Sequence, residues 1–600
     1  MERFLGKTES IPDAQGSPPI DFEKPSQLVN QLSLPRELHA VKMPSKWPLD
    51  EHGLPFNSRL ESVSGPLGIL ESVANRTPVG QSNYGMSKRF YITTAIDYVN
   101  GEPHLGHAYE KVVADVIARF HRSRGVETFF LTGLDEHGQK VQQTAAAKGR
   151  DPQAYCDELA DIWQGMAAKL ELTNDDFIRT TQARHKEFVK AVLSKLHAEG
   201  QIYKKLYEGF YSTKEETFLT EKDRLPDGSF PAMYGEVTKL QEENYYFRLK
   251  NHQQWLIDYI ESTPGFVEPD YRRNEVLGFL KNNELEDLCI SRPLARLNWG
   301  IPLPFDPGFV TYVWFDALSN YASMPASAGD PVLKDFATSA DSRGLSLWPA
   351  DIHVIGKDIL KFHAVYWPIM LRAANLPLPR KLLVHGWWQK DGEKMSKSTG
   401  NVVDPIKVIE EWGVDAFRFY VIRELDIGPD GNWTDGGFKA RYSAELANGL
   451  GNLVNRSLSM LKRYRNGVVP PLSRELSAET EKIIADTRSH LEANHLQAAL
   501  GSIWSLITRA NQYVDQTAPF KLAKDPAQAA RLDEVLYNLA EICRILGVLL
   551  WPFLPRTACN IYSQLGLAET PNQNKDATWG GLAPGHAIGT PAPLFPRKDP

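Results

Sequence analysis

The sequence contains little cysteine, with four thiols in 600 residues: Cys156, Cys289, Cys543 and Cys559. None of them belongs to a Cys-x-x-Cys pair. A disulfide framework and a cysteine zinc site both need more closely spaced thiols, so neither is expected. The pattern favours a reducing compartment in which the thiols act as small buried apolar groups.

Long apolar runs are also missing. The longest, Ile545–Leu554, contains Gly547 and Pro552 and is far shorter than the roughly 18–20 residues that a membrane helix needs. Positive charge is not in excess either, because 67 basic residues face 74 acidic ones and the net charge is -7. An integral membrane protein and a uniformly basic nucleic-acid coat are therefore excluded, while a local basic face is compatible with this total.

The chain is long enough for several domains, since single cores usually stop growing near ~250–300 residues. Residues 1–85 hold 10 of the 40 prolines, 10 serines and no sustained apolar period. We therefore expect a disordered or loosely attached extension there. It has ten acidic residues and neither an Arg-rich amphipathic segment nor a secretory signal, which argues against organelle import or export and for a cytoplasmic protein.

The apolar pattern changes at residue 89. Arg89–Ile96 and Glu127–Gly133 are short β-rich runs, and between them apolar residues from Ala108 to Phe120 recur at helical spacing. A strand, a helix and a second strand at this spacing form a βαβ unit. We therefore expect a parallel sheet that binds ligands at the carboxyl ends of its strands.

The same pattern returns later, with predicted strands at Phe309–Phe315, Ile352–Gly356 and Lys381–Trp388 and a helical stretch at Ile359–Ala374. The predicted fold is α/β, a Rossmann-like parallel sheet split by an inserted connective subdomain and followed by an α-helical bundle. The predicted bounds are 86–185 and 301–385 for the halves of the sheet domain, 186–300 for the insertion, 386–430 for the loop region after the sheet, 431–565 for the helical domain and 566–600 for a tail.

The first chemical motif, HLGH, places His104, Gly106 and His107 where the first strand gives way to a helix. The N–H groups and the positive dipole end of a helix N-terminus favour a phosphate. Two imidazoles and a glycine there predict a polyphosphate site. Histidines that only cap the helix or fill the core are the alternative.

The second motif, KMSKS, follows the last strand and consists of Lys394, Met395, Ser396, Lys397 and Ser398. Two lysines in a glycine-flanked loop can bring two ammonium groups to one anion, although a solvated basic loop has the same composition. On opposite halves of one split sheet, the two motifs predict a triphosphate site with His104, Gly106, His107, Lys394 and Lys397 as catalytic residues.

These motifs resemble the two signatures of the class I aminoacyl-tRNA synthetases. Four further segments are similar to the methionyl members: TTAIDYVNGEPHLGHAY, FLTGLDEHG, TYVWFDALSNY and IGKDILKFHAVYWP. The resemblance implies ATP-dependent ligation of L-methionine to tRNA(Met) through methionyl-adenylate, with release of pyrophosphate and AMP. It also implies Mg²⁺ bound with ATP, and anticodon binding by the helical domain.

The resemblance also implies roles for individual residues. ATP would be bound by His104, His107, Gly356, Asp358, Lys394, Met395, Ser396, Lys397 and Ser398. Asp135 would meet the methionine amino group, in a pocket of Ala95, Ile96, Tyr98, Trp314, Ala317, Leu318, Tyr321, Ile359, His363 and Trp367. The anticodon would be read by Asn452, Arg456 and Phe520, where Phe520 replaces a tryptophan common in the family.

The chain also departs from its relatives. Many of them carry cysteine pairs in the connective insertion, but Ser212 and Glu215 stand here, so no structural zinc and no other metal ligands are expected. No basic tRNA-binding module follows the helical domain, so we expect a monomer without membrane attachment. Two other classes remain open: a small-molecule nucleotidylyltransferase, which shares HxGH but lacks KMSKS, and a non-enzymatic tRNA-binding paralogue, in which eroded signatures would be expected.

Overall fold

The computed structural model describes residues 89–99, 101–212, 217–219, 223–336, 345–395, 400–568 and 570–598. The predicted extension, residues 1–85, and the predicted site residues Ser396, Lys397 and Ser398 lie outside the described residues.

A seven-stranded parallel sheet forms the centre of the α/β domain, in the order β2-β3-β1-β13-β14-β8, with β4 pairing with β3. Its strands are β1 (Arg89–Thr94), β2 (Asp97–Tyr98), β3 (Glu127–Asp135), β4 (Asp176–Arg179), β8 (Val267–Glu268), β13 (Ile352–Gly356) and β14 (Leu382–His385). The two halves meet where Ile92 pairs with Ile352. The predicted split Rossmann-like sheet is thereby confirmed.

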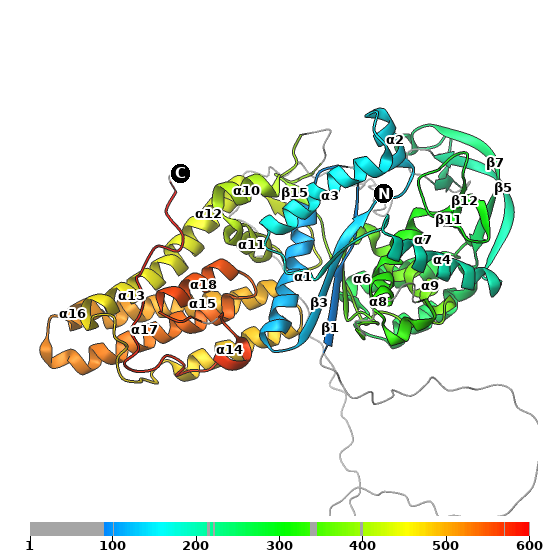
Figure 1. The fold of residues 1–600 in the computed structure, drawn as a ribbon. Helices are drawn as coiled ribbons and strands as arrows, with labels where there is room; N and C mark the ends of the chain where they lie inside the picture. The colour runs from blue at the N-terminus through cyan, green and yellow to red at the C-terminus, as the bar shows by residue number, and fades with distance from the viewer. Residues whose placement is uncertain are drawn as a thin grey trace, which may run out of the picture. The chain divides into compact units, whose positions relative to one another are not determined.

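Helices cover both faces of this sheet (Figure 1). Tyr91 and Ile92, neighbours in β1, are buried in different apolar clusters, as expected for a strand with both faces covered. One face carries α1 (Leu105–Ser123) and α3 (Pro152–Lys169); the other carries α4 (Ala183–Ala198), α5 (Gln253–Ser262), α6 (Asp270–Asn282), α8 (Asn320–Ser327) and α9 (Trp367–Ala373). The helix α2 (Gln139–Ala147) follows β3.

The insertion is built around an antiparallel sheet in the order β6-β5-β7-β9, formed by β5 (Ile202–Ser212), β6 (Thr217–Leu219), β7 (Val237–Phe247) and β9 (Leu288–Cys289). The segment 186–300 is not wholly separate from the catalytic sheet, because β8 lies within it and pairs with β14. A strand of two residues is too short to leave a periodic signal in the sequence.

The predicted strand Phe309–Phe315 is wrong in two respects. The strand β12 (Asp306–Thr311) pairs antiparallel with β10 (Ser291–Pro293) and β11 (Pro302–Leu303) in a separate sheet. The helix α7 (Val313–Ala317) then begins. A short apolar run is compatible with a buried strand or a buried helical turn, and periodicity alone cannot separate them.

The remainder is mainly helical. It includes a small sheet of β16 (Glu393–Lys394), β15 (Trp388–Lys390) and β17 (Gly431–Trp433), of which β17 lies between α11 and α12 in the sequence. The helices are α10 (Pro405–Trp412), α11 (Val414–Arg423), α12 (Asp435–Arg441), a π-helical stretch (Tyr442–Gly451), α13 (Asn452–Arg465), α14 (Ser477–Glu492), α15 (Leu496–Thr517), α16 (Pro519–Leu522), α17 (Ala529–Leu550), α18 (Pro555–Gln564) and α19 (Gln573–Asp576). None of the helices described is both long and apolar enough to cross a bilayer.

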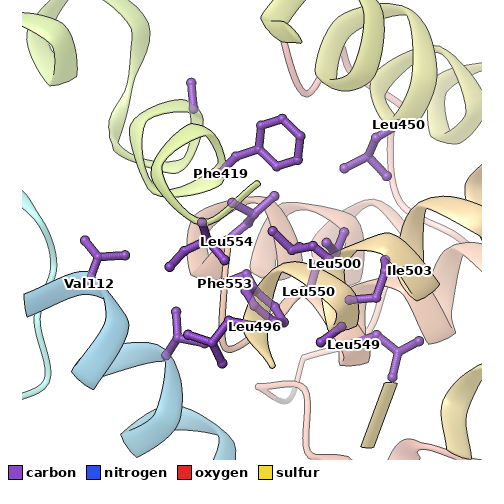
Figure 2. Close-up of a cluster of buried hydrophobic side chains, with 14 of the residues drawn as sticks. Val112, Phe419, Leu450, Leu496, Leu500, Ile503, Leu549, Leu550, Phe553 and Leu554 are labelled. Carbon is purple, nitrogen blue, oxygen red and sulfur yellow. The ribbon is translucent and has the colours of Figure 1, made fainter. Parts of the chain in front are cut away.

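One apolar cluster joins α1 to the helical domain. Figure 2 shows Val112 of α1 in the same cluster as Phe419 of α11, Leu500 of α15 and Leu550 of α17. The helix that begins at the HLGH motif is therefore packed directly against the helical bundle.

The segment predicted as a tail is closely attached to this bundle. Trp579, Leu582 and Ile588 are buried, and the indole N–H of Trp579 donates to the Ser473 carbonyl at 2.8 Å. Its many prolines and glycines rule out a long helix but not an extended segment packed on one.

Candidate active site

The HLGH motif caps the N-terminus of α1. His104 is the N-cap residue, and its Nδ1 accepts the Gly106 N–H at 3.1 Å. In return His107 Nδ1 accepts the His104 N–H at 3.2 Å. Because both rings accept at Nδ1, each neutral ring carries its hydrogen on Nε2. The two imidazoles lie 3.7 Å apart between centroids, at the end of the helix where an anion is favoured.

The second motif is connected to the first through the backbone. Lys394 ends β16, its carbonyl accepts the Asn401 side-chain amide at 3.2 Å, and two residues later the Val403 carbonyl accepts the Leu105 N–H of α1 at 3.2 Å. The residues that follow the second motif therefore reach the N-terminus of α1 at Val403.

The ammonium of Lys394 lies over the Trp387 ring, 4.6 Å from its centroid. Lys357 lies over the same ring at 4.1 Å and also forms an ion pair with Asp430 at 2.7 Å. Met395 packs, partly buried, against the core. Trp387 thus holds two cations beside the strand ends in this structure.

Three predicted residues lie at the carboxyl ends of parallel strands. Asp135 ends β3 and is buried, and Gly356 ends β13. A Cβ on Gly356 would come 2.6 Å from the Asp358 carboxylate, so this glycine allows the exposed Asp358 to fold back over the strand end. Parallel sheets bind ligands at this edge.

Most of the predicted methionine pocket forms one aromatic and apolar group. Tyr321 lies 6.0 Å from Trp367 and 5.6 Å from His363 between ring centroids, and Trp314 stacks on Phe362 at 3.7 Å. The members that share one core cluster, or pack against it, are Ala95, Ile96, Trp314, Leu318, Tyr321, Ile359 and Trp367. Ala317 and His363 are buried beside them in sequence. Tyr98 instead packs on the other cluster, with its hydroxyl 2.7 Å from where a Cβ on Gly138 would lie.

His363 is held as a neutral ring. Its Nδ1 faces the Ile359 carbonyl at 3.0 Å, which can only accept, so Nε2 accepts the Tyr321 hydroxyl at 2.7 Å. Burial lowers the pKa of His363 to about 4, below the ~6.5 of an unfolded histidine.

This histidine predicts acid sensitivity. Because the folded pKa is the lower one, the unfolded chain binds more protons, and stability present above pH ~6.5 is lost as the pH falls towards 4. The contribution of His363 is at most about 3 kcal/mol. Denaturant unfolding between pH 8 and 4.5 should show a shallower acid loss for His363→Gln than for the wild type. Parallel curves for the two proteins would contradict this assignment.

Two buried charge networks were missed in the sequence. In the first, Lys111 lies between Asp97 and Glu110, and Glu110 also faces His385 at 3.0 Å. Charged residues inside the apolar face of a helix are the signal that could have revealed it.

In the second network, Asp316 lies 2.7 Å from both His137 and His185. Burial raises the pKa of Asp316, but the two histidines reverse this and bring the pKa down to about 2. Asp316 is fully buried between these two rings.

The predicted anticodon residues lie on two helices. Asn452 and Arg456 are half-buried on α13, and Arg456 lies 3.4 Å from Asp515 at the end of α15. Phe520, in α16, is 47% exposed. Arg465, the last residue of α13, is engaged with Asp533 and the Ala529 carbonyl.

Among the described residues, no group of three or more His, Cys, Asp or Glu side chains could hold a metal ion. Ser212, where a cysteine ligand was considered, donates to the Tyr234 carbonyl at 2.6 Å. Glu215 lies outside the described residues, so the absence of zinc stays a prediction.

HLGH follows the first strand of a parallel sheet that is formed by two separate parts of the sequence. KMSKS follows the second part, and a helical bundle comes after it. This is the architecture of a class I aminoacyl-tRNA synthetase. Residues 90–458 match the family described as tRNA synthetases class I (M), and residues 465–599 match the anticodon binding domain of methionyl tRNA ligase. The chain therefore belongs to the methionyl-tRNA synthetase family, which confirms the resemblance.

Individual relatives agree. The methionine–tRNA ligase of Fusobacterium nucleatum is 41% identical over 531 residues, covering 86% of this chain and 80% of the relative. That of Caldanaerobacter subterraneus is 42% identical over 520 residues, with the same coverage. The Mycobacterium tuberculosis methionyl-tRNA synthetase in complex with methionyl-adenylate has a TM-score of 0.77 and 39% identity, over 85% of this chain and 100% of that one.

Proposed function

We propose that this chain ligates L-methionine to tRNA(Met) through methionyl-adenylate, consuming ATP and releasing pyrophosphate and AMP. The observation that carries the proposal is the hydrogen bond from Leu105 N–H to the Val403 carbonyl. It ties Val403, which follows the KMSKS motif in the sequence, to the helix that starts at HLGH. The reaction needs aligned reactants and neutralised phosphate charge more than a protein nucleophile.

In this proposal His104 and His107 hold ATP phosphates at the N-terminus of α1, where the end of the helix favours an anion. Gly106 permits close approach. Lys394 and Lys397, with Met395, Ser396 and Ser398, close over the pyrophosphate, while Gly356 and Asp358 meet the nucleoside at the strand ends. Mg²⁺ would be carried mainly by phosphate oxygens and would neutralise their charge.

Methionine would lie with its ammonium at Asp135. The Asp135 carboxylate is buried, where its attraction to a cationic group is little screened by water. The thioether would meet Tyr321, Trp314 and Trp367, since sulfur–aromatic contacts contribute ~0.3–1.5 kcal/mol each. His363 would face it as a neutral ring.

Methionine-dependent exchange of labelled pyrophosphate into ATP tests the first step. Exchange with methionine, and with none of the other amino acids, supports the proposal. Exchange with another small substrate would point to a nucleotidylyltransferase, and no exchange to a non-enzymatic relative. Charging of tRNA(Met) transcripts then tests the second step. We further propose a cytoplasmic monomer, which sedimentation at micromolar concentration would check.

The anticodon contacts give a separate prediction. Phe520→Ala should raise the KM for tRNA(Met) by about tenfold, because an aromatic stacking contact with a base is worth ~1–3 kcal/mol. Methionine-dependent exchange, which needs no tRNA, should stay unchanged. Leu472→Ala is the matched control, since Leu472 is a similarly exposed apolar residue of the helical domain, at 45%. An equal rise in KM for both variants would contradict a specific role for Phe520.

A further inference from the structure

A buried lysine lies one helical turn beyond the HLGH motif. The ammonium of Lys111 contacts Asp97 at 2.7 Å, Glu110 at 3.1 Å and the Ala95 carbonyl at 3.2 Å. These three contacts match the three hydrogens that an ammonium can donate. Its side chain is 3% exposed, and those of Asp97 and Glu110 are 7% and 8% exposed.

Each partner of Lys111 leads to a different part of the site. Ala95 follows β1 and belongs to the proposed methionine pocket. One Asp97 oxygen lies 4.0 Å from His107 Nε2. Lys111 therefore joins the amino acid side of the site to the phosphate side.

The third partner, Glu110, leads towards the segment that contains Lys394. Glu110 faces His385 Nε2 at 3.0 Å, and His385 Nδ1 faces the Gly386 carbonyl at 2.8 Å. His385 ends β14, and Trp387, which holds Lys394, follows two residues later. A Cβ on Gly386 would lie 2.0 Å from the Pro429 carbonyl, so the backbone just after β14 packs closely against another segment.

Charge makes this arrangement depend on Lys111. Burial alone would lower the pKa of Lys111, but Asp97 and Glu110 raise it, so the lysine stays charged. Burial, together with the charge of Glu110, raises the pKa of Asp97 to about 7 despite Lys111. Without the ammonium, two buried carboxylates would face each other.

We propose that Lys111 is a positioning residue of the adenylation step. Its ammonium fixes three parts of the site relative to one another: the end of β1 through Ala95, His107 through Asp97, and the end of β14 through Glu110. The inference rests on the proposed function. It assigns Lys111 no contact with substrate. Misplacement of reacting groups by about 1 Å can lower a rate by 10²-fold, so loss of the Lys111 ammonium should lower kcat.

The test measures kcat and both KM values in pyrophosphate exchange for Lys111→Met, Asp97→Asn and the double variant. Each single variant should lower kcat roughly tenfold or more. The double variant should be no worse than Lys111→Met, because residues that act as one unit are not additive. Asp97→Asn keeps the shape of the side chain, so it remains informative where Lys111→Met fails to fold.

The pH profile separates positioning from a merely structural role. Lys111, Glu110 and His107 of α1 face Asp97. Protonation of Asp97 near pH 7 weakens its pair with Lys111, so wild-type kcat should decline below that pH. Asp97→Asn should be slow at every pH and lack this decline. A folded variant with kcat within threefold of wild type at pH 7.5, or an unchanged acid decline, overturns the inference.

Glu541→Gln is the control. Glu541 and Arg544 form a buried ion pair at 2.6 Å in the helical domain, which pyrophosphate exchange does not use. Its exchange kinetics should equal those of the wild type even where stability falls. An equal kcat loss in Glu541→Gln would show that general destabilisation explains the effect. Absence of methionine-dependent exchange in the wild type would overturn the proposed function, and this inference with it.

Discussion

His104→Asn should lower methionine-dependent pyrophosphate exchange by about 100-fold while leaving α1 folded. Asparagine is among the best N-cap residues, so its side chain can replace Nδ1 as acceptor for the Gly106 N–H. It cannot place a ring Nε2 hydrogen at the helix end. Removing one preorganised donor to developing charge typically lowers kcat by ~10²–10³-fold.

Two further variants make this result specific. His104→Ala removes cap and ring together, so it should lose the same activity and also about 1 kcal/mol of stability. His121→Asn removes the histidine at the far end of α1, where the ring stacks on Phe90 at 3.7 Å, and exchange should remain within twofold of wild type. If His104→Asn keeps a third or more of the wild-type rate, the imidazole is not part of the phosphate site.

The central sheet could be predicted because its strands carry a clear local pattern. In β1 and β13 four or more consecutive residues are buried, and a run of apolar β-formers shows this directly in the sequence. β8 has two residues and α7 has five, so neither is long enough for a period to develop. Contacts with distant parts of the chain, rather than local propensity, determine that β8 forms a strand and α7 a helix.

For the site, the sequence pointed to residues at the ends of strands and helices, and it missed the buried charged residues that pack next to them. HLGH and KMSKS are contiguous motifs, and the pocket residues followed from resemblance. The partners of Lys111 come from β2, α1 and the turn after β1, and the partners of Asp316 from the turn after β3 and from α4. These contacts join residues of different strands, turns and helices, so no spacing rule predicts them. The same holds for Tyr98, which the fold places against Gly138 rather than in the aromatic group.

The largest stability effect is expected at Arg418, in α11. This fully buried guanidinium lies 2.7 Å from Asp115 of α1. It also donates to the Leu170 carbonyl after α3 at 3.1 Å, and to the carbonyls of Phe553 and Pro552 after α17 at 2.9 and 3.1 Å. Its partners thus come from both the catalytic half and the helical bundle, at the apolar cluster of Figure 2.

Arg418→Met should lower the free energy of unfolding in urea by about 3–5 kcal/mol, because three carbonyls lose their donor and the buried Asp115 keeps only one of its two arginine partners, Arg119. Arg556→Ala is the control: Arg556 pairs with Glu171 at the surface nearby, and exposed pairs contribute ~0–1 kcal/mol. Because Arg418 bridges the two halves, we also expect Arg418→Met to separate their unfolding, so that fluorescence and circular dichroism give different midpoints. Coincident midpoints with a loss below 1 kcal/mol would show that the apolar cluster alone holds α1 to the bundle.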